Sequence, residues 1–461
     1  MPDVYDVVVI GAGPTGENVA DRATRGGLST VIVESELVGG ECSYWACMPS
    51  KALLRPVGVV AEAGHVAGVR GARLDPPAVL GRRDSFASGW KDDGQVAWLR
   101  GAHIDLVRGQ GRLTGPREVT VGSTRLQARH AVVIATGSRA LIPPIPGLAE
   151  ARPWTSREAT SSQTVPGRLA IIGGGVVGCE MAAAWQALGA QVTLLVRGQN
   201  LLSRVEEFAG DLVADGLRSA GAEVRCGVSV TGADRASAGG PVSLRLDDGT
   251  AIEADEVLVA TGRAPRTGDL GLETAGLSPG SWLEVDDTCR VSGVDGGWLY
   301  AAGDVNHRAL LTHMGKYQGR ICGDAIAAKA RGEEIAVRAW ADHSAVPQVI
   351  FTIPEVAAVG QTFAEAQRAG RSVRAVDYDI GSVAGAGLFA DGYTGRARMV
   401  VDEDDQVIVG VTFAGPGVGE MIHAATIAVA GRVPLTRLWH AVPSYPTISE
   451  VWLRLLEAYG L

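Results

Sequence analysis

The chain has 461 residues, which is enough for about three domains that each bury a core. A net charge of -9 argues against nucleic-acid binding, and no apolar run approaches the roughly 20 residues of a membrane span. A strand pattern that begins by Val4 leaves no room for a signal peptide, and six cysteines are too few for a disulfide scaffold. We therefore expect a cytoplasmic protein with neither nucleic acid nor a membrane as partner.

The first predicted elements form a nucleotide-binding pattern. A strand over residues 6–10 leads into Gly11, Gly13 and Gly16, then a helix pattern, then a strand that ends at Glu34. The glycines allow a tight turn, close approach of a pyrophosphate and close helix packing. Glu34 lies 18 residues after the last glycine, where its carboxylate can accept hydrogen bonds from ribose hydroxyls. The pattern predicts a dinucleotide site.

Two cysteines, Cys42 and Cys47, follow directly, with Gly40 before them and Lys51 after them. Residues five apart on a regular helix lie roughly 8–9 Å apart, whereas a disulfide tolerates less than about 7 Å between Cα atoms. We therefore expect a distorted turn that feeds a helix, whose dipole would lower a thiol pKa. Zinc is the main alternative, but no matching second ligand pair exists. The sequence predicts a redox-active pair and no metal site.

The strand-turn-helix-strand unit returns between residues 168 and 196 with a second set of glycines: Gly173, Gly175 and Gly178. The position 18 residues after Gly178 is Val196, and Arg197 and Arg204 follow it. Arginine offers a planar, charged fork suited to phosphate, so we infer NADPH rather than NADH. Alternatively both arginines are solvated surface residues, and glycine rather than alanine at 178 is a mild counter-signal.

Three more short apolar strands end in turns of small residues that can pass close to a cofactor. They end at Thr136 and Gly137, at Gly262, and at Gly303 with Asp304. Asp304 is suited to a flavin ribitol, although an aspartate there can equally cap a helix. Two dinucleotide units in one chain indicate a flavoenzyme with a nicotinamide partner.

With these motifs in this order, the chain resembles the class I pyridine nucleotide-disulfide oxidoreductases over essentially its full length. The resemblance implies an α/β fold with two Rossmann-like dinucleotide-binding domains, for FAD and NADPH, and a C-terminal α+β dimerisation domain. The expected segments are 1–150 for the first FAD part with the cysteines, 151–268 for the NAD(P)H domain, 269–340 for the second FAD part and 345–461 for the dimerisation domain.

The resemblance also implies roles for single residues. Cys47 matches the thiol that stacks against the flavin, and Cys42 the outer thiol that attacks substrate. Lys51 would lie near flavin N5 with Glu180 as its partner, and Thr312 near the flavin ring. The residues assigned to FAD are Gly11, Gly13, Gly16, Glu34, Gly40, Lys51, Thr136, Gly137, Gly303, Asp304 and Thr312. Those assigned to NADPH are Gly173, Gly175, Gly178, Glu180, Arg197, Arg204 and Gly262.

One position departs from the family pattern. The family's usual ending is His-Pro-Thr-x-x-Glu, whose histidine serves the partner subunit's site as general acid and base. This chain has Tyr445 in that place and keeps Glu450. A phenol with a pKa near 10 can donate a proton but is a poor base at neutral pH. His440 either takes over the histidine's role or is a structural or surface residue. The resemblance also implies a homodimer with a shared active site.

The sequence predicts an FAD enzyme that takes hydride from NADPH and reduces a small-molecule, thiol or disulfide acceptor through Cys42. In the alternative, electrons leave the flavin directly, as in a quinone or dye reductase or a soluble transhydrogenase. Mercuric reductase shares the tyrosine, but it needs a C-terminal cysteine pair and no cysteine follows Cys322 here. A redox sensor is the non-enzymatic hypothesis. Tyr44 and Trp45 either select a flat or small acceptor or pack the cysteine loop.

Overall fold

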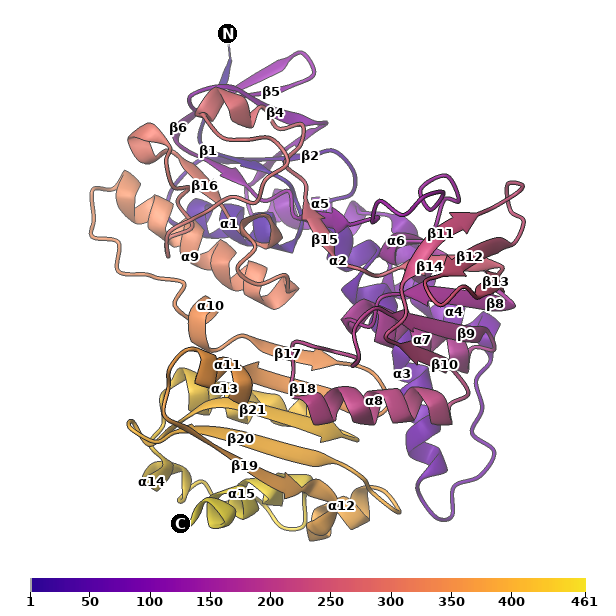
Figure 1. The fold of residues 1–461 in the computed structure, drawn as a ribbon. Coiled ribbons are helices and arrows are strands. Elements are labelled where there is room, and N and C mark those ends of the chain that lie inside the picture. Colours follow the sequence, from indigo (N-terminus) through magenta and orange to yellow (C-terminus); the bar gives the residue numbers. More distant parts are fainter. Residues whose placement is uncertain (1) are drawn as a thin grey trace. The chain divides into compact units, whose positions relative to one another are not determined.

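The computed structural model describes residues 2–461, which form two compact units of three segments each (Figure 1). The described segments of the first unit are 2–49, Asp84–Leu141 and Gly262–Asp342. Those of the second unit are Ser50–Arg83, Ile142–Thr261 and His343–Leu461. The helices that cross from one unit to the other are α3 (Cys47–Gly64), α4 (Pro76–Phe86) and α10 (Ala341–Ser344).

The first unit is built on a seven-stranded sheet in the order β3-β2-β1-β6-β5-β4, with β16 also paired to β6. Its strands are β1 (Asp3–Ile10), β2 (Thr30–Glu34), β3 (Asp105–Arg108), β4 (Gly111–Gly115), β5 (Glu118–Val121), β6 (Thr124–Ile134) and β16 (Leu299–Ala301). The run from Val7 to Ile10 is buried throughout, as expected of a parallel strand covered on both faces. A separate antiparallel pair joins β7 (Ser138–Ala140) to β15 (Arg263–Pro265).

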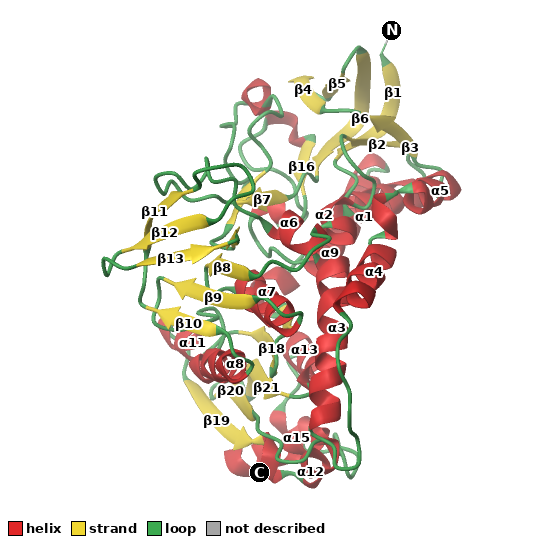
Figure 2. Cartoon of the chain, turned by 90° about the vertical axis from the view of Figure 1, so that its right-hand side faces the viewer, coloured by secondary structure: helices red, strands yellow, loops and turns green. Residues whose placement is uncertain are grey.

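Helices of the first unit are α1 (Pro14–Arg25), α2 (Gly40–Tyr44), α5 (Asp93–Gly101) and α9 (Thr312–Ala330). Helices α1 and α9 lie side by side (Figure 2). Their backbones approach closely because α9 presents glycines to α1. A Cβ atom on Gly315 would lie 2.3 Å from Thr15 Oγ1, and one on Gly319 would lie 2.7 Å from the Thr15 carbonyl oxygen.

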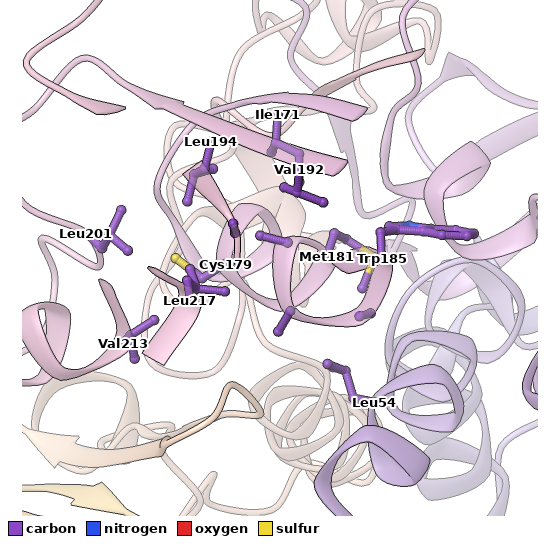
Figure 3. Close-up of a cluster of buried hydrophobic side chains, with 14 of the residues drawn as sticks. Leu54, Ile171, Cys179, Met181, Trp185, Val192, Leu194, Leu201, Val213 and Leu217 are labelled. Carbon is purple, nitrogen blue, oxygen red and sulfur yellow. The ribbon is translucent and has the colours of Figure 1, made fainter. Parts of the chain in front are cut away.

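The second unit contains a parallel sheet in the order β10-β9-β8-β14 and a three-stranded antiparallel sheet. The parallel strands are β8 (Arg168–Ile172), β9 (Gln191–Val196), β10 (Glu223–Cys226) and β14 (Glu256–Val259). The antiparallel strands are β11 (Val230–Asp234), β12 (Val242–Leu246) and β13 (Ala251–Ala254). Its helices are α6 (Ser156–Ser161), α7 (Val176–Ala187) and α8 (Glu207–Ser219). Trp185 and Met181 of α7 belong to a buried cluster with Leu194 of β9 (Figure 3).

The C-terminal part of the second unit is a five-stranded antiparallel sheet in the order β17-β18-β21-β20-β19. Its strands are β17 (Pro347–Ile350), β18 (Glu355–Gly360), β19 (Val373–Asp379), β20 (Arg396–Asp402) and β21 (Val407–Gly415). Its helices are α11 (Phe363–Arg368), α12 (Ala384–Phe389), α13 (Ile422–Ala430), α14 (Leu435–Leu438) and α15 (Val451–Tyr459). Every residue of the central strand β21 is buried.

The predicted fold class is confirmed: the chain contains two Rossmann-like parallel sheets with helices and a C-terminal α+β domain, and the first sheet is completed by β16, which comes after the second sheet in the sequence. The expected segment limits at 150, 268 and 340 stay predictions. Among residues 2–461, no helix combines the length and the apolar character that crossing a bilayer requires.

Candidate active site

The two glycine fingerprints have the same geometry. Gly11 has φ of +104°, and a Cβ there would lie 2.5 Å from the Ala135 carbonyl oxygen. The third glycine, Gly16, is fixed by packing, because its Cβ would lie 1.9 Å from the Gly11 carbonyl oxygen. The middle glycine differs: the nearest atom to a Cβ on Gly13 is the Gly40 Cα, at 3.9 Å. Open space therefore faces the turn between β1 and α1, where a phosphate group would approach the helix N-terminus.

The second fingerprint repeats these contacts. A Cβ on Gly173 would lie 2.4 Å from the Ala260 carbonyl oxygen, and one on Gly178 would lie 1.9 Å from the Gly173 carbonyl oxygen. A Cβ on Gly175 would meet nothing within 4 Å. A methyl group at 178 would overlap the Gly173 carbonyl oxygen of the same turn whichever nucleotide binds, so glycine at this position does not discriminate between NADPH and NADH.

Two alanine substitutions in this turn should affect different properties: one the stability of the fold, the other the binding of the nucleotide. Gly178→Ala should lower the free energy of unfolding by roughly 1–3 kcal/mol, because the added methyl group overlaps a backbone oxygen. Gly175→Ala should change unfolding by less than about 0.5 kcal/mol, yet weaken nicotinamide-nucleotide binding by filling the open space. Denaturant unfolding and nucleotide titration of the FAD-loaded protein measure the two effects. Equal destabilisation by both variants would contradict this account.

The carboxylate of Glu34 stands at the end of β2, beside the first fingerprint. It accepts hydrogen bonds from the backbone N–H groups of Ala12 at 2.7 Å and of Glu36 at 2.8 Å. These bonds fix the carboxylate at the position where the fingerprint expects a ribose. The side chain is half-buried, so it remains accessible from the turn.

The three short turns that were expected near a cofactor lie in the first unit, and they are tied to one another. Ser138, next to Gly137, hydrogen-bonds to the carboxylate of Asp304, whose pKa is raised because the group is buried. Thr136 donates to the carbonyl oxygen of Arg266 at 2.8 Å. The backbone N–H of Gly303 donates to buried Gln318 at 2.8 Å. Gly262 has φ of +152° and leads into β15, which pairs with β7.

The cysteine pair straddles a break between two helices, as the spacing predicted. Cys42 lies in α2, which ends at Tyr44, and Cys47 is the first residue of α3. Both cysteines are half-buried, and the structure has no disulfide between them. Cys47 Sγ lies 3.2 Å from the hydroxyl oxygen of Thr312, the first residue of α9. A Cβ on Gly40 would lie 2.8 Å from the Gly13 Cα, so the cysteine loop presses directly on the first fingerprint.

The pKa of Cys42 is raised in this dithiol form, because its thiol hydrogen-bonds to Cys47 and is buried. Thr312 and Lys316 oppose that shift. The lowered pKa expected from the helix N-terminus therefore does not extend to Cys42. The physical reason is that two neighbouring thiols cannot both ionise cheaply, so the first thiolate suppresses the second.

Tyr44 packs the loop. Its ring is buried, its hydroxyl donates to the Val38 carbonyl oxygen at 2.9 Å, and its own carbonyl oxygen accepts from Trp90 Nε1 at 3.1 Å. Trp45 is half-buried and meets the Tyr44 ring edge-on at 5.7 Å. Of the two hypotheses for this dipeptide, Tyr44 fits the packing role.

In the second unit, Lys51 of α3 and Glu180 of α7 form the ion pair that the resemblance implied. The distance from Lys51 Nζ to Glu180 Oε2 is 2.7 Å, and Glu180 is only 3% exposed. The other carboxylate oxygen accepts from the backbone N–H of Phe351 at 3.0 Å. The Lys51 ammonium also lies 5.0 Å from the centre of the Phe351 ring.

The other side chains of the second unit that the sequence singled out are exposed, except that of Glu450, which accepts a hydrogen bond from a backbone N–H group. Arg197 and Arg204 are exposed, and neither has an ion pair or hydrogen bond among residues 2–461. Tyr445 is 77% exposed and is likewise without a partner in that range. Glu450 accepts from the backbone N–H of Gly385 at 2.9 Å, so its carboxylate orients α12. His440 is exposed.

Sequence reasoning missed an ion-pair cluster beside Cys42. Glu41 binds Arg263 at 2.9 Å and Arg266 at 2.7 Å, one carboxylate oxygen to each guanidinium. Arg263 also donates to the Ser138 hydroxyl, which links the cluster to Asp304. The arginines lie more than 220 residues after Glu41, so no local spacing could have revealed the contact.

Comparison with known proteins agrees with this geometry. Residues 5–319 match the family described as pyridine nucleotide-disulphide oxidoreductase, and residues 346–455 match its dimerisation domain. The chain belongs to the pyridine nucleotide-disulphide oxidoreductase family, and it is an FAD-dependent enzyme of that class. FAD and a pyridine nucleotide are the cofactors typical of the family. The two glycine fingerprints fit these cofactors, because each leaves open space at its middle glycine.

Among curated proteins, the chain is 31% identical to a dihydrolipoyl dehydrogenase of Chlamydia pneumoniae, with 98% of this chain and 96% of that protein covered. It is 33% identical to a dihydrolipoyl dehydrogenase of Thermus scotoductus, with 98% and 97% covered. Among solved structures, the HOCl-induced flavoprotein disulfide reductase RclA from Escherichia coli, as its Cu(II) complex, has a TM-score of 0.85 at 23% identity and 99% coverage of both chains. This last similarity concerns the fold alone.

Proposed function

We propose that the enzyme uses NADPH to reduce a disulfide, or another thiol-reactive acceptor, through the Cys42–Cys47 pair. Bound FAD would supply the transfer of reducing equivalents between nicotinamide and sulfur. The observation that carries the proposal is the pair itself: two hydrogen-bonded thiols at a helix break, with the inner sulfur 3.2 Å from Thr312 Oγ1. The roles of the individual residues are part of this proposal.

The sulfur chemistry balances with an acceptor disulfide. The thiolate of Cys42 attacks one acceptor sulfur, a mixed disulfide forms, and the other acceptor sulfur leaves as a thiolate that takes up a proton. Cys47 then attacks Cys42 of the mixed disulfide and releases the second acceptor thiolate. The acceptor gains two electrons, and the cysteine pair becomes a disulfide. Thr312 can hold the inner sulfur in place through its hydroxyl group.

The relatives guide the choice of acceptor. Several are named for dihydrolipoyl groups, which carry two neighbouring thiols. Tyr445 is a weaker acid–base group than histidine, so an acceptor with a good leaving thiolate suits this chain best. Lipoamide and an aromatic disulfide are therefore the first acceptors to compare. We also propose a cytoplasmic location, because a close cysteine pair in a long chain with six cysteines fits a catalytic pair of a reducing compartment.

A second candidate function rests on Tyr445. Because a phenol is a poorer acid–base group than the histidine usual in the family, disulfide reduction would lack part of its general acid–base catalysis. Electrons would then pass to a quinone, a dye or a second nicotinamide without using the cysteine pair. Substitution of Cys42 separates the two functions, because electron transfer directly from the flavin does not need this sulfur.

The preference for NADPH is assigned to Arg197 and Arg204. Both guanidinium groups lie beyond the end of β9, exposed and without partners within residues 2–461, so both are available to a 2′-phosphate. Arg197→Glu should lower the NADPH-to-NADH ratio of kcat/KM at least about tenfold, which corresponds to one lost charged contact. Steady-state kinetics with both nucleotides measure the ratio.

Arg218→Glu is the matched control, because Arg218 is an exposed residue of α8 that forms an ion pair with Asp215. It should leave the ratio unchanged. If Arg197→Glu also leaves the ratio unchanged, the assignment of NADPH is wrong.

We further propose a homodimer. The C-terminal domain matches a dimerisation domain, and it exposes apolar side chains that a second copy would cover. Val442 is 84% exposed and Leu388 73% exposed. Light scattering at assay concentration should give twice the chain mass, and a fully active monomer would contradict the proposal.

A further inference from the structure

Glu17 is a buried carboxyl group that the proposed mechanism does not use. It lies in the first turn of α1, directly after the first fingerprint, and is 8% exposed. Its Oε1 atom has no hydrogen-bond partner among residues 2–461. Burial raises the pKa of Glu17 to about 7, and the positive charge of Lys316 opposes the shift. This carboxyl group therefore ionises near neutral pH.

Lys316 belongs to α9, one turn after Thr312. The close approach of α9 to α1, through Gly315 against Thr15, holds this turn of α9 beside the first turn of α1, which contains Glu17. Lys316 is exposed and forms no ion pair or hydrogen bond within the described range of the chain. Its ammonium group is free to act on its neighbours through its charge.

The same ammonium group acts on the outer thiol of the pair. Thr312, four residues before it on the helix, contacts Cys47 at 3.2 Å. The positive charge of Lys316 lowers the pKa of Cys42, against the larger effects of Cys47 and of burial. The charge of one lysine therefore acts both on a buried carboxyl group and on the outer sulfur.

We propose that Lys316 is a positioning residue whose charge stabilises the thiolate of Cys42 from within the same chain, and that ionisation of Glu17 reduces this effect. The proposal rests on the proposed function of the cysteine pair. Lys316 would thereby supply, within a single chain, part of the electrostatic stabilisation that the family's histidine gives and that Tyr445 does not.

The other charged and titratable groups around these residues come from several elements. Glu34 of β2 raises the pKa of Glu17, and Glu17 in turn raises that of Tyr44 in α2. Glu41, next to Cys42, is neutralised by its two arginines. While Glu17 is protonated, the full charge of Lys316 acts on the Cys42 thiolate. Once Glu17 ionises, its negative charge offsets that of Lys316, and the thiolate is stabilised less.

Alkylation of Cys42 tests the proposal directly. The FAD-loaded Cys47→Ser protein is treated with iodoacetamide between about pH 5 and pH 10, and the rate at Cys42 is followed by peptide mass spectrometry. In the parent the rate curve should show an added inflection near pH 7, where Glu17 ionises. Lys316→Met should slow alkylation about tenfold below the thiol pKa, equal to a rise of about one pKa unit. Lys316→Arg should retain the parent curve.

Two further variants make the result specific. Glu17→Gln should remove the inflection and speed alkylation about threefold above it. Lys329→Met, roughly 20 Å further along α9 at 1.5 Å per residue, should leave the curve unchanged. A Lys316→Met curve that superimposes on the parent would overturn the role of Lys316, and a persisting inflection in Glu17→Gln would overturn that of Glu17. Because alkylation needs no acceptor, failure here is distinguishable from failure of the proposed function.

Discussion

Cys42→Ser is expected to lower NADPH-dependent disulfide reduction by at least about 10³-fold, because it removes the sulfur that attacks the acceptor. Reduction of a dye that takes electrons from the flavin should persist in the same variant. The expectation follows from the position of Cys42, half-buried in α2 and hydrogen-bonded to Cys47. Steady-state rates with a disulfide and with a dye, measured on one preparation, give both numbers.

Cys226→Ser is the matched control, because Cys226 is another half-buried cysteine but lies in β10 of the second unit. It should leave both rates unchanged. If disulfide reduction survives in Cys42→Ser, electrons reach the acceptor without this pair, and the second candidate function replaces the first.

Lys51→Met should lower the free energy of unfolding by about 3 kcal/mol, at the low end for a broken buried ion pair because Lys51 is partly exposed. The loss arises at Glu180, which is 3% exposed and would keep a buried charge supported only by the backbone N–H of Phe351. Denaturant unfolding of the FAD-loaded protein measures it.

The double variant Lys51→Met with Glu180→Gln should recover most of the lost stability, because the buried charge is then absent. Lys329→Met serves as the control, since that lysine is exposed and its ammonium group donates to the carbonyl oxygen of Gly297. A double variant that is no more stable than Lys51→Met would show that the ion pair is not the cause.

The sequence predicted those parts of the site that local constraints define. Gly16 and Gly178 are fixed by a carbonyl oxygen five residues earlier in the chain, so the spacing alone identifies them. Likewise, the five-residue separation of Cys42 and Cys47 predicted the break between α2 and α3. The ion pair of Lys51 and Glu180 came from the family resemblance, because no local pattern connects the two residues.

Contacts between distant segments could not be predicted. Glu41 binds Arg263, and the charge of Lys316 acts on Glu17, only because strands and helices far apart in the chain pack together. The raised pKa of Cys42 also depends on such packing, since it needs the geometry of both thiols and their burial. The hypotheses for Tyr44 were likewise separated only by its buried ring and its bond to Val38.

Anaerobic titration with NADPH tests the central claim most directly, with the flavin absorbance and the thiols of Cys42 and Cys47 followed together. A disulfide and a flavin each take two electrons, so complete reduction should consume about two equivalents of NADPH and release both thiols. If the yellow colour is lost after about one equivalent while both sulfurs stay oxidised and unreactive, the pair does not carry electrons to the acceptor.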